Sequence, residues 1–308
     1  MTVPTLAEYG RAWLAAVRHS LRPASYEDYR YRLNKLICPR LGTIRLDEVT
    51  VPVVRSWLGE LGKVAAPSTT AKAYTLLCRL MVMAAEEGLT PVGHRWRVAG
   101  AGRPRYGARP YIDLDQVHDL ARACGTRYEV MALLAVYGPL RFGEVAGLRR
   151  QDITPPGLYE LVTISAALDD RTGRRVEPKT RSARRTLSMP RFMSNLLARQ
   201  LRFYAGTSPD SLLFTSPEGE RLRRSNFNRR VWQPAVETCG LEGLHFHDLR
   251  HAGGTAMAAS GAAPMRVLMA RLGHASSKAT EHYLRLAAGG DEALAARLEE
   301  INTERGRA

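Results

Sequence analysis

The second half of the chain contains six residues whose side chains suit the cleavage of a phosphate ester: Arg141, Lys179, His247, Arg250, His274 and Tyr283. Attack on a phosphodiester adds negative charge around phosphorus, and a planar guanidinium can bind two of the phosphate oxygens at once. A phenol has a pKa of about 10, so at neutral pH its proton must be removed during attack or its phenolate stabilised. Two guanidiniums, two imidazoles, an amine and a phenol could together supply that chemistry.

Each of these residues taken alone has an ordinary structural explanation. Arg141 and Glu144 are three residues apart and would usually form a salt bridge, and Tyr283 is one of 12 tyrosines, most of which belong in cores. His247 and His251 have the i, i+4 spacing of a metal-binding pair. However, no glutamate stands between them in an HExxH frame and no third ligand is evident. We therefore expect no metal site.

The order of the six residues and the motifs around them resemble the tyrosine recombinases, the phage integrase family. Arg141 lies in GPLRFGE, Lys179 in PKTRSARR, His247 and Arg250 in HDLRH, and His274 in LGHAS, with Tyr283 nine residues farther on. The resemblance covers nearly the whole chain, and every catalytic position of the family has a match. One departure is Pro139, where the family often has Gly-Leu before this arginine, and we expect no mechanistic effect from it.

The resemblance implies a reaction in which Tyr283 attacks a DNA phosphate and forms a 3′-phosphotyrosyl bond. Arg141 and Arg250 would bind the non-bridging phosphate oxygens. Lys179, in the turn between two predicted strands, would protonate the 5′ oxygen that leaves. Since the covalent bond conserves the free energy of the ester, rejoining would need neither ATP nor metal, and the chain has no P-loop motif. We expect no cofactor.

Three further side chains receive supporting roles. By the resemblance, His247 accepts the proton of the phenol, and His274 hydrogen-bonds a phosphate oxygen in the transition state. Glu144 is interpreted as a carboxylate that orients an arginine or a histidine, not as a base.

The resemblance also implies the partners. These are double-stranded DNA at attachment or recombination sites, three further copies of the chain in a homotetramer that assembles on DNA from a monomer in solution, and a host bending or directionality factor. An integrase of a phage or mobile element is the preferred interpretation. The sequence leaves open an Xer-like chromosome-dimer resolvase, a type IB topoisomerase and a non-catalytic DNA-binding regulator.

The charge agrees with a polyanionic partner. The chain of 308 residues has 45 basic and 30 acidic residues, a net charge of +15, with a pI near 10.1. Predicted contacts to the DNA backbone are Arg103, Arg105 and Arg109 in a linker, Arg174, Arg175, Arg181, Arg184 and Arg185 in a hairpin, and Arg223 and Arg224 before a helix.

The predicted fold class is mainly α with a small antiparallel β-sheet, in two domains. Residues 1–90 form a helical core-type DNA-binding domain, SAM-like by the resemblance, 91–112 a basic linker, and 113–308 an α+β catalytic domain with a C-terminal tail helix. Residues 157–168 and 184–190 have strand character and could pair with each other. Further helices are expected at 190–204, 225–239, 246–260, 264–271 and 277–286.

Helix ends can also be predicted within the first domain. Ser25 is a candidate N-cap for a helix that contains Tyr29 and Leu33. A later helix should begin at Pro67-Ser68 and end at Gly88, a residue suited to a left-handed C-cap.

The remaining composition predicts a cytoplasmic, nucleoid-associated protein with no membrane partner. No apolar run approaches the roughly 20 residues of a membrane span. The four cysteines are far apart and show neither the spacing of a zinc cluster nor that of a disulfide framework.

Overall fold

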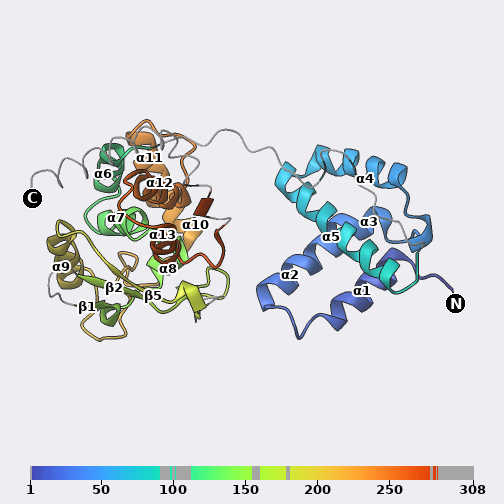
Figure 1. Ribbon diagram of the computed structural model, residues 1–308, viewed down its shortest axis with the longest axis horizontal. Helices are drawn as coiled ribbons and strands as arrows, with labels where there is room; N and C mark the ends of the chain where they lie inside the picture. Colours follow the sequence, from blue (N-terminus) through green and yellow to red (C-terminus); the bar gives the residue numbers. More distant parts are fainter. Residues whose placement is uncertain are drawn as a thin grey trace, which may run out of the picture. The chain divides into compact units, whose positions relative to one another are not determined.

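The computed structural model describes residues 2–90, 98, 101, 112–154, 160–177, 181–277, 280, 281 and 283. The chain divides into two compact units, Met1–Gly107 and Ala108–Ala308 (Figure 1). The predicted linker contacts Arg103, Arg105 and Arg109 and the predicted acid Lys179 lie outside the described residues. The same is true of the predicted C-terminal tail helix and of most of the helix expected at 277–286.

The described part of the first unit is helical. Its helices are α1 (Leu6–Ala16), α2 (Pro23–Tyr31), a π-helical turn (Arg32–Ile37), α3 (Cys38–Leu41), a 3-10 turn (Leu46–Glu48), α4 (Val51–Val64) and α5 (Pro67–Glu86). A capping box between Thr5 and Glu8 begins α1. Leu6, Leu33 and Leu77 are fully buried within one apolar core, and burial of such side chains is the main stabilising term for helices of this length.

The predicted helix ends are partly right. Ser25 is not the N-cap of its helix: α2 begins two residues earlier at Pro23, and Arg22 holds the cap position without a side-chain bond. Proline suits the first helical turn, because its missing N–H has no partner there and its φ is already helical. The prediction for α5 is confirmed, since Gly88 has φ +75° just after the helix.

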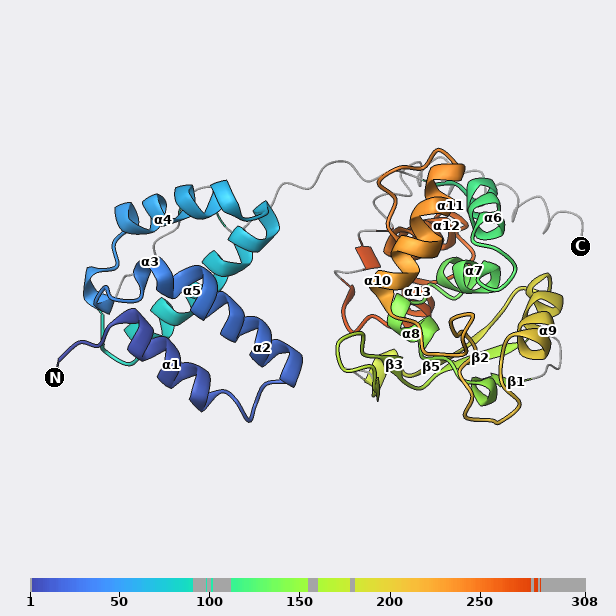
Figure 2. The ribbon, with the colours of Figure 1, turned by 180° about the vertical axis from the view of Figure 1, so that it is seen from behind.

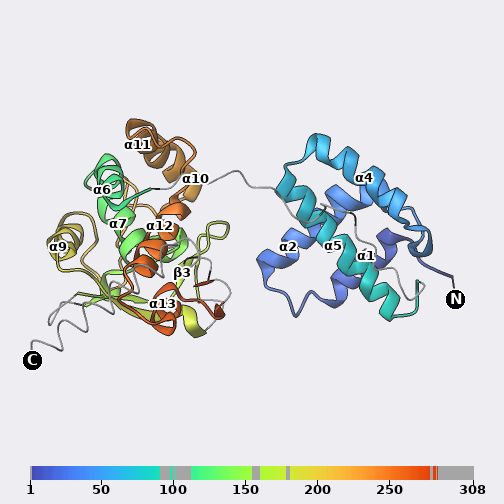
Figure 3. The ribbon, with the colours of Figure 1, turned by 45° about the horizontal axis from the view of Figure 1, so that its top comes forward.

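The described part of the second unit is mostly helical with two small antiparallel sheets, which confirms the predicted fold class. Its α-helices are α6 (Leu114–Ala123), α7 (Glu129–Tyr137), α8 (Phe142–Ala146), α9 (Met193–Phe203), α10 (Arg224–Phe227), α11 (Gln233–Thr238), α12 (Phe246–Ala259) and α13 (Met265–Leu272). Helix α12 packs against α7 and α13 (Figure 3).

The strands of this unit are short. They are β1 (Ile153–Thr154), β2 (Leu161–Ile164), β3 (Ala167–Leu168), β4 (Arg175–Val176) and β5 (Arg185–Ser188). One sheet has the order β1-β2-β5, with Val162 opposite Leu187, so the predicted pairing of the two strand-like segments is correct. The predicted first strand is divided, because Ala167–Leu168 leave β2 and form a separate hairpin with β4. Figure 2 shows this hairpin next to α8.

Glycines permit two close contacts that fix the catalytic elements. A Cβ at Gly253 of α12 would lie 2.0 Å from the carbonyl oxygen of Val136 in α7, so only glycine allows these helices to meet. Likewise, a Cβ at Gly143 would lie 2.7 Å from the Leu168 carbonyl oxygen, which brings α8 against β3. Both contacts hold α8 and α12 in place; Arg141 is the N-cap of α8, and α12 carries His247 and Arg250.

Candidate functional site

The elements that carry the predicted catalytic residues lie close together in the second unit. Arg141 is the N-cap residue of α8, His247 and Arg250 lie on α12, and His274 follows α13, which ends at Gly273 with φ +65°. Tyr283 lies ten residues after Gly273.

Glu144 of α8 gathers three guanidiniums around one buried carboxylate. Its Oε1 is 2.9 Å from Arg141 Nη1, and its Oε2 is 3.1 Å from Arg185 Nη2 and 3.9 Å from Arg250 Nη1. Burial acts to raise the pKa of the Glu144 carboxyl, but the Arg185 and Arg141 groups outweigh burial and lower it. The carboxylate therefore stays charged and orients the two predicted phosphate-binding arginines.

Arg185 was missed as a site residue. The sequence analysis assigned it to the DNA backbone, whereas its side chain is only 6% exposed and is directed inward. Besides Glu144, it donates to the Arg271 carbonyl oxygen at 2.9 Å and the Ala183 carbonyl oxygen at 3.0 Å. Arg185 and Glu144 are 41 residues apart, so no local spacing could have paired them.

Arg250 is enclosed in this structure. Its side chain is 1% exposed and donates to the carbonyl oxygens of Pro139 and Leu272. Burial and the nearby Arg141 charge lower the pKa of Arg250 to about 10, so the group remains a cation at neutral pH. The contact with Pro139 uses a main-chain oxygen, which any residue at that position would supply.

His274 has both ring nitrogens engaged. Arg250 Nη2 lies 3.0 Å from Nε2 and can only donate, so Nε2 accepts and the proton resides on Nδ1, 2.9 Å from Thr280 Oγ1. Burial and then the positive charge of Arg250 lower the pKa of His274 to about 4. The imidazole is therefore neutral at pH 7, and in this arrangement Nε2 has no proton to offer a phosphate oxygen.

Tyr283 is buried among these groups, with 3% of its surface exposed. Its hydroxyl lies 3.1 Å from His251 Nδ1, and its ring stacks on His274 with centroids 6.1 Å apart. His251 in turn meets His247 edge-on, with centroids 4.8 Å apart. The sequence analysis considered His251 only as a metal ligand, although its i, i+4 spacing from His247 did indicate that both lie on one helix face.

The described residues predicted to contact DNA differ in exposure. Arg174, Arg184, Arg223 and Arg224 are exposed, although Arg184 is also 2.6 Å from Glu177. Arg175 is half-buried, and its guanidinium bonds Asp152 at 2.8 Å, Ser165 at 2.7 Å and the Gly147 carbonyl at 3.0 Å. These bonds fasten the β3–β4 hairpin to the body of the unit. The side chain of Arg181 lies outside the described set.

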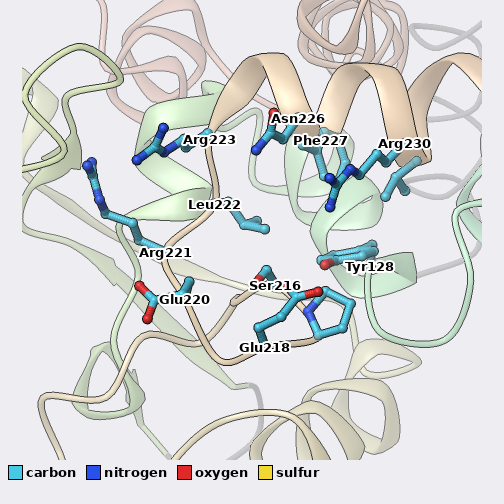
Figure 4. A pocket seen from close by; sticks show the side chains of 12 residues that line it. Tyr128, Ser216, Glu218, Glu220, Arg221, Leu222, Arg223, Asn226, Phe227 and Arg230 are labelled. Atoms are coloured by element: carbon cyan, nitrogen blue, oxygen red, sulfur yellow. The ribbon is translucent and has the colours of Figure 1, made fainter.

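A separate hollow of about 520 Å³ lies between Tyr128 and the segment 216–231 (Figure 4). Arg221, Arg223 and Arg230 line it together with the acidic Glu218 and Glu220. Its lining has both signs of charge, and it contains none of the predicted catalytic residues.

Across the described ranges, no group of three or more His, Cys, Asp or Glu side chains is placed to hold a metal ion. In the same part of the chain, no helix has the length and apolar character needed to cross a membrane.

Comparison with known families identifies the chain. Residues 110–289 match the phage integrase family, and residues 5–62 match its N-terminal SAM-like domain. The chain belongs to the phage integrase family. This confirms the resemblance that the motifs indicated, and it makes the protein a site-specific recombinase that acts through a tyrosine.

Several similar proteins are named integrases. The integrase of Mycobacterium phage L5 is 29% identical over 297 residues, covering 94% of this chain and 78% of the relative. The putative prophage phiRv2 integrase of Mycobacterium tuberculosis strain H37Rv is 28% identical over 297 residues, covering 96% and 78%.

Solved structures share the fold. The Tn1549 transposon integrase in complex with a circular intermediate DNA has a TM-score of 0.78 at 16% identity, covering 91% of this chain and 94% of that one. A lambda integrase dimer bound to a core site has a TM-score of 0.67 at 16% identity, covering 91% and 95%.

Proposed function

We propose that this integrase-family protein cuts and rejoins DNA strands at attachment sites of a phage or mobile element, with Tyr283 as the nucleophile. The observation that supports this most is a continuous set of contacts. It runs from the Tyr283 ring to His274, from His274 Nε2 to Arg250 at 3.0 Å, and from both arginines to Glu144. A phenol, an imidazole and two guanidiniums joined in one set of contacts suit attack on a phosphate.

Arg141 and Arg250 would share the phosphate but reach it differently. The Arg141 side chain is 44% exposed and uses Nη1 on Glu144, so its other donors can meet a phosphate oxygen directly. Arg250 is 1% exposed and uses three of its five N–H groups on two main-chain oxygens and His274, so the groups that cover it have to move before a phosphate can reach it. When Arg250 releases Nε2, His274 becomes able to shift its proton and donate to the phosphate, the role that the sequence assigned to it.

The leaving 5′ oxygen needs a proton, and we assign this step to Lys179 on the family motif PKTRSARR. The partner is double-stranded DNA, on which we propose that four copies assemble. The mycobacteriophage and prophage relatives are named integrases, which favours integration over chromosome-dimer resolution.

The test is formation of a covalent adduct. Purified protein is incubated with nicked duplexes made from the DNA that flanks its gene, and adducts resistant to denaturant are mapped. Wild-type protein should become attached to a 3′ phosphate. Tyr283→Phe should bind the same DNA and form no adduct.

The matched control is Tyr204→Phe, because Tyr204 is half-buried in the same unit and its hydroxyl lies 2.7 Å from Thr126 Oγ1. It should form adducts at the wild-type rate. Adducts from Tyr283→Phe at that rate would reject Tyr283 as the nucleophile.

A further inference from the structure

One face of α12 forms the surface on which Tyr283 rests. His247, Arg250, His251 and Gly254 follow the i, i+3, i+4, i+7 spacing that aligns side chains along a helix. Arg250 bonds His274, whose ring stacks on Tyr283. His251 and Gly254 lie against Tyr283 itself.

Gly254 leaves space for the phenol ring. A Cβ at this position would lie 2.7 Å from Tyr283 Cε1, 2.9 Å from Cδ1 and 3.0 Å from Cζ. Glycine inside a helix costs about 0.5–1 kcal/mol relative to alanine, so its presence in the middle of α12 has a reason in packing. The Tyr283 ring lies directly against the backbone of α12 at Gly254. Any side chain at this position would push the ring away from the helix.

His251 meets the reacting atom. Its Nδ1 is 3.1 Å from Tyr283 Oη, with the rings inclined by 37° and their centroids 5.7 Å apart. This distance is within reach of direct proton transfer. His274 also stacks on the Tyr283 ring, but its Nε2 already accepts from Arg250 and its Nδ1 holds the proton. Of these two imidazoles, His251 is the one with a nitrogen placed to accept.

We propose that His251, not His247, takes the proton of Tyr283 during strand cleavage, and that Gly254 positions the phenol for this transfer. The inference rests on the proposed nucleophile. With its hydrogen on Nε2, His251 accepts the phenol proton on Nδ1 as the Oη–phosphorus bond forms and the bond from phosphorus to the 5′ oxygen breaks. The imidazolium then holds that proton, and the 5′ oxygen is protonated by the separate acid.

Rejoining reverses these steps. A 5′-hydroxyl attacks the phosphotyrosine and returns its proton to the group that served as the separate acid, the Oη–phosphorus bond breaks, and the leaving phenolate takes its proton back from His251. His247, edge-on to His251, would support the orientation of that ring rather than exchange the proton itself.

The test compares His251→Gln with His247→Gln in single-turnover cleavage of a nicked substrate at a series of pH values. Glutamine keeps a hydrogen-bond acceptor but is no base, so His251→Gln should bind DNA normally and cleave about 100-fold more slowly at pH 7. Its rate should climb with pH toward the pKa of a phenol, about 10. Wild-type protein should instead lose activity on the acid side, where imidazole is protonated.

Among the groups around His251 are His247 of its own helix and Tyr283 of the C-terminal segment, and Arg250 precedes His251 directly in the chain. His247→Gln should therefore keep the loss of activity at acid pH. If His251→Gln cleaves at the wild-type rate with the wild-type pH profile, the inference is overturned. Absence of adduct from the wild-type protein would instead reject the proposed function itself.

His118→Gln is the matched control, because His118 Nε2 is 2.8 Å from the Tyr137 hydroxyl in the same unit and outside the cluster. It should leave both rate and pH profile unchanged.

A second variant tests whether Gly254 positions the Tyr283 ring. Gly254→Ala should displace the phenol and slow cleavage by about 100-fold, the cost of misplacing a reacting group by about 1 Å, with DNA binding retained. Its control is Gly59→Ala in α4, where an added Cβ meets nothing within 4 Å. Cleavage by Gly254→Ala at the wild-type rate would show that this glycine does not position the nucleophile.

Discussion

The arginine cluster around Glu144 makes a quantitative prediction about Glu144→Gln. Glutamine keeps the shape but removes the charge that three guanidiniums share at 2.9, 3.1 and 3.9 Å. At about 4 Å and an effective dielectric of about 20, each pair is worth about 4 kcal/mol. The cost of burying the carboxylate offsets much of this attraction. Removing one partner from a buried ion pair typically costs about 3–5 kcal/mol, because the opposite charge remains buried.

We therefore expect Glu144→Gln to lower the free energy of unfolding of the second unit by about 3 kcal/mol or more. A domain has only about 5–15 kcal/mol in total. The measurement is urea denaturation followed by far-UV circular dichroism, fitted with separate transitions for the two units. Glu177→Gln is the matched control, since Glu177 pairs with Arg184 but its side chain is 81% exposed. Such surface pairs contribute about 0–1 kcal/mol.

A loss below about 1 kcal/mol for Glu144→Gln, similar to that of Glu177→Gln, would refute this reasoning. It would mean that main-chain hydrogen bonds, such as those from Arg185 and Arg250 to nearby carbonyl oxygens, hold the arginines without the carboxylate.

Two other predictions concern protons. The pKa of His274 is lowered to about 4, so below its ordinary value of 6.5 the unfolded chain takes up a proton that the folded chain refuses, and the free energy of unfolding should fall as pH drops from 6.5 toward 4. Thermal melting at pH 7 and pH 5 measures this, and a His274→Asn variant with an equal drop would assign the loss to another group. Lys179→Ala should slow cleavage of a normal strand yet cleave well when the leaving group is a 5′-thiol, which needs no acid. Failure of the thiol substrate to restore the rate would give the lysine a different role.

The sequence predicted the parts of this site that depend on local spacing. The relation of His247, Arg250 and His251 follows from helix geometry, and Gly88 ends α5 because glycine alone adopts positive φ easily. The pairing of β2 with β5 followed from two β-branched segments joined by a polar turn. The family motifs added the identity of the chemistry, which spacing alone left undecided.

The contacts that the sequence did not predict join residues far apart in the chain. Arg185 looked like one more member of a basic hairpin, and only the folded sheet brings it to Glu144. Arg175 likewise depends on Asp152, 23 residues away. For His251, the helical spacing from His247 was predicted correctly, but the contact with Tyr283 was not. That contact depends on the path of the chain after α13, which local spacing does not specify. The prediction of Ser25 as an N-cap was wrong because the helix already begins at Pro23.

The enclosure of Arg250 links substrate capture to the internal order of the protein. Its guanidinium bonds Pro139, three residues before α8, Leu272 at the end of α13, and His274, which in turn bonds Thr280 near Tyr283. A DNA phosphate that recruits the Arg250 guanidinium draws it away from His274, and loss of that bond loosens the contact between α12 and the segment that carries the phenol. Binding of DNA at Arg250 and movement of Tyr283 are thereby coupled through one side chain. Arg250→Ala would therefore disturb both folding and reactivity.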